Sequence, residues 1–304
     1  MYKYMSLTKR NCLVFLRDRS AVFFSLLSML IVLMLMGIFL GKMNVESITA
    51  LLGEFGGARD LLADKENAVH LVQYWTLAGI LMVNSVTVTL TVTGVMVNDA
   101  GEGRLESFYT APVSKNLIAF SYMTAAAFIG TLFCTITLTV GMTYIRAAGG
   151  ALLPAKALVR IFLYILLNVS ICSIIMYLIA LFVKSSSAWS GLATIVGTLV
   201  GFAGAVYMPL GALPKGAATV LKYTPILHGT SLLRKICCSE MLEKTFSGIS
   251  ATVTAQYKDN MGITVSLGDK AVSSSSQILF LGICGIVTLA AVILLVKKKK
   301  VSDR

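Results

Sequence analysis

The sequence predicts an all-α polytopic membrane protein, with six transmembrane helices in a single transmembrane domain that covers residues 1–304. Apolar residues make up 57% of the chain and charged residues only 13%, whereas soluble domains carry about 25% charged residues. The mean hydropathy is +0.83. The charges are also unevenly placed, since they are missing from long windows and crowded into short ones. This distribution excludes two soluble domains and favours a chain that crosses a membrane.

The six helices are predicted from windows of roughly 18 residues or more that contain no Asp, Glu, Lys or Arg. A hydrocarbon core about 30 Å thick needs about 20 helical residues. A charge at its centre costs about 2.5–3.5 kcal/mol, so each uncharged window indicates a span. The windows are 20–41, 72–97, 118–145, 161–183, 185–214 and 278–296. Spans one to five thus fall within 20–207, and 278–304 holds the sixth span and a basic tail.

Within the second window, residues 86–93 alternate Val or Leu with Thr, as a β-strand would. A single strand cannot cross a bilayer, because its backbone groups would have no partners. Threonine is tolerated in a membrane helix, where its hydroxyl bonds to the preceding turn. A helix is therefore predicted here.

The ends of the chain predict its orientation. Residues 1–19 mix apolar and basic side chains, which predicts an interfacial helix; a plain cytoplasmic tail is the alternative. Lys and Arg are dense both in 1–19 and in the tail from Lys297 to Arg304. Both termini are therefore predicted to be cytoplasmic, in a multi-pass protein of the cell membrane. The basic residues of the loop 144–161 argue weakly against this topology.

The segment 208–277, between the fifth and sixth spans, is predicted to lie on the external side and to hold a re-entrant part and a loop. Pro209, Pro214 and Pro225 exclude one straight helix over 208–236 and favour short re-entrant helices. Residues 245–276 are rich in Ser, Thr and Gly, which predicts an exposed loop with or without short strands. The fold of this loop is left open.

The net charge of +12 does not indicate a nucleic-acid partner, because the basic clusters flank apolar stretches and fit lipid headgroups instead. No C-x-x-C motif occurs, so no metal site is expected. The adjacent Cys237 and Cys238 are expected to be free thiols, since a disulfide between neighbours is strained, although their state is left open. His70 and His228 are expected at the surface.

The most specific pattern is the segment 98–115, NDAGEGRLESFYTAPVSK, between the second and third windows. It resembles the membrane subunits of type 2 ATP-binding-cassette exporters, whose corresponding connection carries an acidic–x–Gly–Thr–Leu–Glu pattern and then Pro-Val. The matching residues are Glu102, Gly103, Leu105, Glu106, Pro112 and Val113, with Arg104 where the family often has Thr. Residues 207–214 and 224–234 resemble the family's segments after the fifth span, so the resemblance covers nearly the whole chain.

The resemblance implies a permease subunit that forms the pathway for ATP-driven export of an amphiphilic compound, such as a drug, lipid or peptide. It implies a dimer with a second copy or a related permease, and ATPase chains that hold ATP and Mg. No cofactor or catalytic residue is then expected on this chain. The implied ATPase-coupling residues are Glu102, Gly103, Arg104, Leu105, Glu106 and Pro112. An ordinary solvated loop is the alternative for this segment.

Several motifs that other functions would require are missing from the sequence. The chain has no G-x-x-x-x-G-K-[ST] phosphate loop, no H-E-x-x-H and no G-x-S-x-G. An ion-coupled carrier or channel would need ionisable residues inside its spans, and a membrane-embedded enzyme would need a catalytic constellation. Both remain alternatives of lower rank. The substrate is not identified, nor is the choice between homodimer and heterodimer.

Two stripes predict a translocation surface. Asn84, Thr87, Thr91 and Gly94 share one face of a helical second span. Gly197, Gly201 and Gly204 share a face of the fifth span, where the spacing of the first two allows close helix approach. The resemblance implies that these two spans line the central route of the dimer. The alternative is that Asn84 and the threonines only hold helices together within one subunit.

Overall fold

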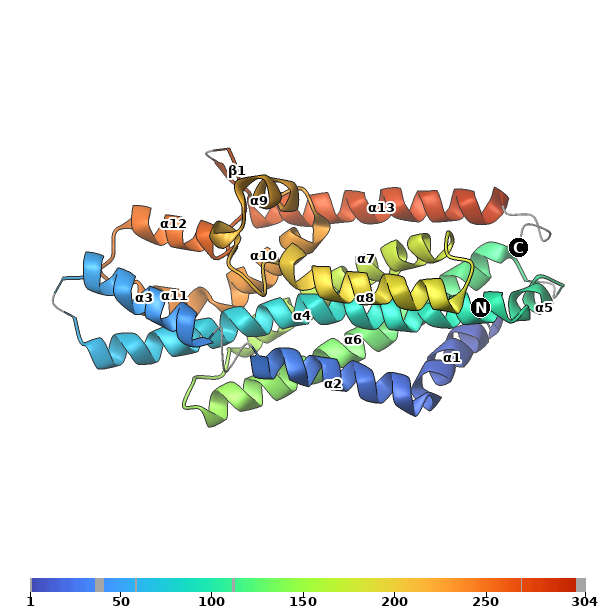
Figure 1. Cartoon of the computed structure of the whole chain (residues 1–304), viewed down its shortest axis with the longest axis horizontal. Helices are drawn as coiled ribbons and strands as arrows, with labels where there is room; N and C mark the ends of the chain where they lie inside the picture. Colours follow the sequence, from blue (N-terminus) through green and yellow to red (C-terminus); the bar gives the residue numbers. More distant parts are fainter. Residues whose placement is uncertain (1, 36–40, 58, 111–112, 269, 299–304) are drawn as a thin grey trace.

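In the computed structural model, which describes residues 2–35, 41–57, 59–110, 113–268 and 270–298, the chain is organised around α4 (Leu61–Gly101). This helix has 41 residues and runs most of the length of the molecule (Figure 1). The carboxylate of Asp60 caps its first turn by accepting from the backbone N–H groups of Leu62 and Ala63. The alternating Val–Thr stretch lies inside α4, so the prediction of a helix there is confirmed.

Five described helices are long and apolar enough to cross a membrane. They are α4, α6 (Lys115–Ala147), α7 (Ala155–Ala180), α8 (Ser186–Ala203) and α13 (Ser274–Lys298). Of the first predicted span, the structure describes α2 (Arg19–Leu35), and the window then runs into residues 36–40, outside the described part. The fifth window was drawn too long, because α8 ends at Ala203. There the chain turns through Ala205, whose φ is 49°.

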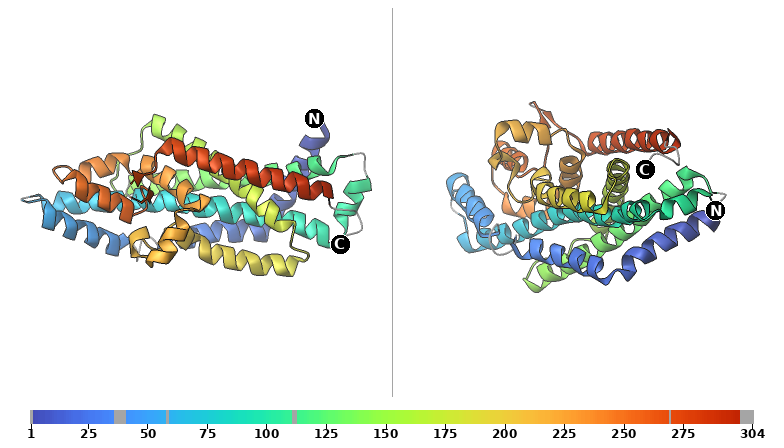
Figure 2. Two further views of the ribbon diagram at one scale, coloured as in Figure 1. Left: turned by 90° about the horizontal axis from the view of Figure 1, so that it is seen from above. Right: turned by 45° about the vertical axis from the view of Figure 1, so that its right-hand side comes forward.

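The apolar helices pack around α4, which is buried along most of its length. Helices α6, α7 and α8 contact it directly. By contrast, only 17% of the most apolar window of α8 and of α13 is buried within the chain. The described residues thus form a mainly helical bundle in which the apolar window of α4 is 89% buried and those of α8 and α13 are largely uncovered; Figure 2 shows the same arrangement from two further sides.

The chain begins with the predicted amphipathic helix, α1 (Tyr2–Arg17). Its apolar side buries Cys12 and Phe15, and the Phe15 ring lies 6.0 Å from that of Phe133 in α6. The start of α1, the short helix α5 (Arg104–Thr110) and the end of α13 lie at one end of the molecule (Figures 1 and 2). We call this the α5 end.

The opposite end carries several short elements. They are α3 (Gly41–Phe55), the 3₁₀ turn η2 (Leu210–Ala212), α9 (Lys215–Leu221), α10 (Pro225–Cys237), α11 (Ser239–Thr245), α12 (Ala251–Asn260), and the antiparallel strands β1 (Ser266–Leu267) and β2 (Lys270–Ala271). The region that was expected to be an open loop therefore contains α12 as well as two short strands. Whether α9 and α10 re-enter a membrane stays a prediction.

Arg234 of α10 holds this end together. The side chain is fully buried, and no described carboxylate pairs with it. Its guanidinium donates to the carbonyls of Ala205 at 2.7 Å and Met261 at 3.1 Å, and it lies 4.1 Å from the Trp75 ring of α4. Trp75 Nε1 donates to the same Met261 oxygen at 2.8 Å. Burial lowers the pKa of Arg234 to about 9, so it remains cationic at neutral pH.

Both histidines were wrongly expected at the surface, since both are buried. His70 Nδ1 lies 3.0 Å from Gln73 Oε1 within α4. His228 Nε2 lies 2.9 Å from the Lys222 carbonyl oxygen, and burial lowers the pKa of the ring. The His228 ring packs 4.7 Å from that of Phe280 in α13, and an added Cβ at Gly150 would lie 3.1 Å from His70 Nδ1. These are contacts between residues far apart in the chain, which a count of charge-free windows does not reveal. The expectation for Cys237 and Cys238 is confirmed, because both are buried free thiols.

Candidate functional site

The segment that was predicted to couple the chain to an ATPase forms a sharp corner between α4 and α5. The Glu102 N–H donates to the Asn98 carbonyl, and Glu102 is the C-terminal cap of α4. Gly103 then takes a φ of +74°, a left-handed conformation that glycine adopts without strain. Its carbonyl accepts from the Glu106 N–H at 3.1 Å and so begins α5. Gly103 therefore sets the direction in which α5 leaves α4.

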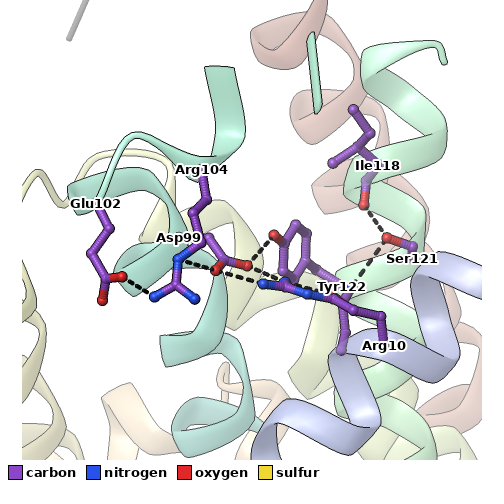
Figure 3. A network of polar contacts seen from close by, with 8 residues as sticks. Arg10, Asp99, Glu102, Arg104, Ile118, Ser121 and Tyr122 are labelled. Carbon is purple, nitrogen blue, oxygen red and sulfur yellow. Dashed lines mark hydrogen bonds and ion pairs between the residues drawn. The ribbon is translucent and has the colours of Figure 1, made fainter. Parts of the chain in front are cut away.

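A buried carboxylate, Asp99, lies at the centre of this end of the molecule. It is 1% exposed. Arg10 of α1 pairs with it through its two terminal nitrogens: Nη1 donates to Asp99 Oδ2, and Nη2 donates to Asp99 Oδ1 at 2.9 Å. The Tyr122 hydroxyl of α6 donates to Asp99 Oδ2 at 2.6 Å. One side chain thus joins α1, α4 and α6 (Figure 3).

Arg104 extends this network into α5. Its Nε lies 3.4 Å from Asp99 Oδ1, and its Nη2 pairs with Glu102. Both Arg104 and Glu102 are about half exposed, with side chains at 49% and 59%. The network therefore runs from the buried carboxylate of Asp99, paired with the partly exposed Arg10, to the solvated pair Arg104–Glu102 at the corner.

Two further contacts tie α1 to its neighbours. The Arg10 guanidinium carbon lies 5.4 Å from the centre of the Phe108 ring of α5, a cation–π contact. Asn11 donates to Ser121 Oγ of α6 at 3.1 Å. Through Phe108, α5 contacts α1 directly, and through Asn11, α1 contacts α6.

The electrostatics explain why two arginines gather here. The carbonyl ends of a helix carry partial negative charge, so a carboxylate in the last turn of α4 is unfavourable by itself. Arg10 and Arg104 supply the compensating positive charge. The hydrogen bond to Asp99 in turn raises the pKa of Arg10.

The predicted coupling residues occupy different positions at this corner. Both Leu105 and Glu106 belong to α5; the side chain of Leu105 is buried, whereas that of Glu106 is exposed. Pro112 lies outside the described residues. Arg10, Asp99 and Tyr122 were not among the site residues predicted from the sequence. A signal for Asp99 existed, since an acidic residue directly after a long uncharged stretch, at a helix C-terminus, requires a cationic partner.

The two predicted stripes do not each form one surface. Asn84 is 3% exposed and donates to Thr137 Oγ1 of α6 at 2.8 Å. Gly94 faces α8, where an added Cβ would lie 2.9 Å from Trp189 Nε1. Thr87 is half-buried and Thr91 exposed, and each hydroxyl donates to the carbonyl four residues earlier.

The stripe divides because α6 crosses α4 obliquely. Near Leu77 and Asn84, α6 covers the same side of α4 as the stripe, through Gly141 and Thr137. Further along, α6 has moved around α4 to Thr89, which faces Gly130. Thr91 is consequently left uncovered although it is nearly in line with Asn84.

The glycines of α8 divide in a similar way. An added Cβ at Gly201 would lie 2.2 Å from the Tyr207 ring, and one at Gly204 would lie 3.1 Å from Thr230 Oγ1. Gly201 and Gly204 are therefore packed against side chains of this same chain. Gly197 faces open space, with no atom within 4 Å of an added Cβ.

Comparison with known sequences agrees with this architecture. No curated protein matches the chain. A family model described as ABC-2 family transporter protein matches residues 42–294, which covers most of the chain. Members of this family are multi-pass permease subunits of ATP-binding-cassette transporters, which are typically non-catalytic and act with an ATPase subunit. With its apolar helical bundle and this match, the chain belongs to the ABC-2 transporter family.

Proposed function

We propose that the chain is an export permease that works as a dimer with two separate ATPase chains and moves an amphiphilic compound out of the cell. The proposal includes six spans and cytoplasmic termini at the α5 end. ATP and Mg would be held by the ATPases. The observation that carries it is the network at Asp99, because it links the exposed helix α5 to three longer helices.

The network fits a mechanical role. A partner that pushes on α5 acts through Arg104 on Asp99 and through Phe108 on Arg10. The ion pair between the half-exposed Arg104 and Glu102 is of the kind that is individually weak, at about 0.2–1 kcal/mol, so Arg104 can change partners when a ligand shifts the balance between two arrangements. Glu106, which is exposed on α5, is the proposed contact for the ATPase.

The proposed pathway is narrower than the two stripes. It keeps Thr87 and Thr91 on α4 and Gly197 on α8, which the chain itself leaves uncovered. Exposed hydroxyls also line α8 at Ser190, Thr194 and Thr198. Each donates to its own helix, which lowers its cost in an apolar setting while it still offers an acceptor to a substrate. Asn84, Gly94, Gly201 and Gly204 are assigned to packing.

The test is a charge reversal on α5. The chain, tagged and purified from its native membranes, is expected to retain an ATPase that hydrolyses MgATP. Glu106→Arg should leave assembly of the permease intact and reduce substrate-stimulated hydrolysis about tenfold, a change equivalent to about 1.4 kcal/mol. Glu54→Arg, an exposed site on α3 at the opposite end, is the matched control.

Two results would count against this function. ATP hydrolysis by the chain freed of its partners would remove the need for an ATPase subunit. Normal stimulation in the Glu106→Arg complex would remove α5 from the coupling pathway.

A further inference from the structure

A cleft opens between α3, the first half of α4 and the end of α6, far from the α5 end. Its volume is about 710 Å³, within the range of about 300–1,000 Å³ that is typical of small-molecule sites. Helix α3 packs along α4 to form one side (Figure 1). At Leu77 the cleft reaches Gly141 of α6, where an added Cβ would lie 2.4 Å from Leu77 Cδ1. The helices are therefore in close contact there.

The position of the cleft relative to a bilayer follows from helix geometry. The stretch of α4 from Asp99 to Leu77 rises about 33 Å, which is close to the hydrocarbon thickness of about 30 Å. If the polar network marks one boundary, a core of this thickness ends near Leu77, within the uncharged window 72–97. The exposed Tyr144 of α6, which also lines the cleft, fits that level, where tyrosines are enriched. The cleft is thus placed at the membrane boundary, with Leu77 and Tyr144 at its inner end and Lys42 and Lys65 further out.

The lining is largely apolar but carries a cationic excess. Val45, Val69 and Ile145 contribute apolar surface. Lys42 and Lys65 face the same space with only Glu46 to oppose them. All three charged side chains are exposed, and within the described residues none of them forms an ion pair.

We propose that this cleft binds an amphiphile with an acidic head group, whose apolar part packs on the valines while Lys42 and Lys65 neutralise the charge. A cationic amphiphile would meet two like charges and one opposite charge. A purely apolar ligand would leave the lysines unused. The proposal concerns binding alone, so it stands or falls independently of transport and of the ATPase.

Dodecyl phosphate is the probe, with dodecyltrimethylammonium as its cationic counterpart. Binding to the full chain in phosphatidylcholine nanodiscs is measured by native mass spectrometry at low salt. We expect dodecyl phosphate to bind at least tenfold more tightly than the cation. The double variant Lys42→Gln/Lys65→Gln should weaken dodecyl phosphate binding about tenfold, and Thr49→Trp, which narrows the cleft, should also abolish it.

Thr49 suits this purpose because it is half-buried and, among the described residues, its hydroxyl donates to the carbonyls of Val45 and Glu46 in its own helix. Lys270→Gln, at an exposed lysine away from the cleft, is the control and should bind like the wild type. Nanodiscs with phosphatidylglycerol separate two sources of ligand: competition identifies a membrane lipid, and its absence identifies a free compound. Equal binding of the two probes, or undiminished binding in either cleft variant, would overturn the site.

Discussion

The two ends of the bundle hold a buried charge in opposite ways. At the α5 end, Asp99 is surrounded by side chains from three other helices, Arg10, Arg104 and Tyr122. At the other end, Arg234 is bonded to backbone carbonyls and packed on Trp75. Side chains can change partners by rotation, whereas backbone carbonyls move only with their whole segment. The first end is therefore suited to switching and the second to fixing the fold.

The largest effect on stability is expected at the end that holds Arg234. Arg234→Met should lower the free energy of unfolding by about 3–5 kcal/mol, because the Ala205 carbonyl loses its donor, the Met261 carbonyl keeps only the donor from Trp75, and the cation–π contact with Trp75 is lost. Unfolding by SDS in mixed micelles measures this loss. Arg234→Lys should lose less, since it keeps a charge but not the planar fork that reaches both Ala205 and Met261. Equal stability of Arg234→Met and the wild type would show that the carbonyls find other donors.

An intermediate effect is expected at Asp99. Asp99→Asn should destabilise the chain by about 2–3 kcal/mol, since Arg10 loses its counter-charge while remaining partly solvated. Glu102→Gln, at an exposed carboxylate, should change stability by less than about 0.5 kcal/mol. A double-mutant cycle with Arg10→Met isolates the pair. A coupling energy near zero would remove the distinction between the ends.

The smallest effect on stability, together with a large one on transport, is expected at Thr91. Thr91→Trp should leave stability within about 0.5 kcal/mol, because the site is exposed. Transport by the assembled complex should be blocked if Thr91 lies on the pathway. Thr139→Trp on α6 is a close control, since that exposed hydroxyl also donates to its own helix at 2.9 Å. If Thr91→Trp and Thr139→Trp both block transport, the cause is the added bulk on an exposed helix face and not a position on the pathway.

How much the sequence could predict depends on whether a feature is local. The helical state of 86–93 and the amphipathic character of α1 follow from neighbouring residues, and both were predicted. The length of α8 was overestimated, because Ala205 bends the chain within an uncharged window. Burial of His70 and His228 depends on contacts with distant residues, such as Gly150 for His70 and Phe280 of α13 for His228, which apolar windows do not indicate.

The candidate site was predictable in part for the same reason. Its corner was found, because Gly103 and the acidic residues around it are adjacent in sequence. Its centre was missed, because the Arg10–Asp99 pair joins residues of α1 and α4 that are far apart in the chain. Asn84 is covered within the chain, because helical periodicity describes an isolated helix, whereas the angle at which α6 crosses decides what is covered.

The unbroken length of α4 has a further consequence, which is that a small tilt becomes a displacement of several ångströms at both ends. A rod of 41 residues is about 60 Å long, so a tilt of about 5° around its middle moves each end by about 3 Å in opposite directions. At one tip this is comparable to the 3.4 Å that separates Arg104 from Asp99. At the other tip it changes the width of the cleft beside α3. A lever of this kind reports an event on one side of the membrane to the other without any helix having to unfold.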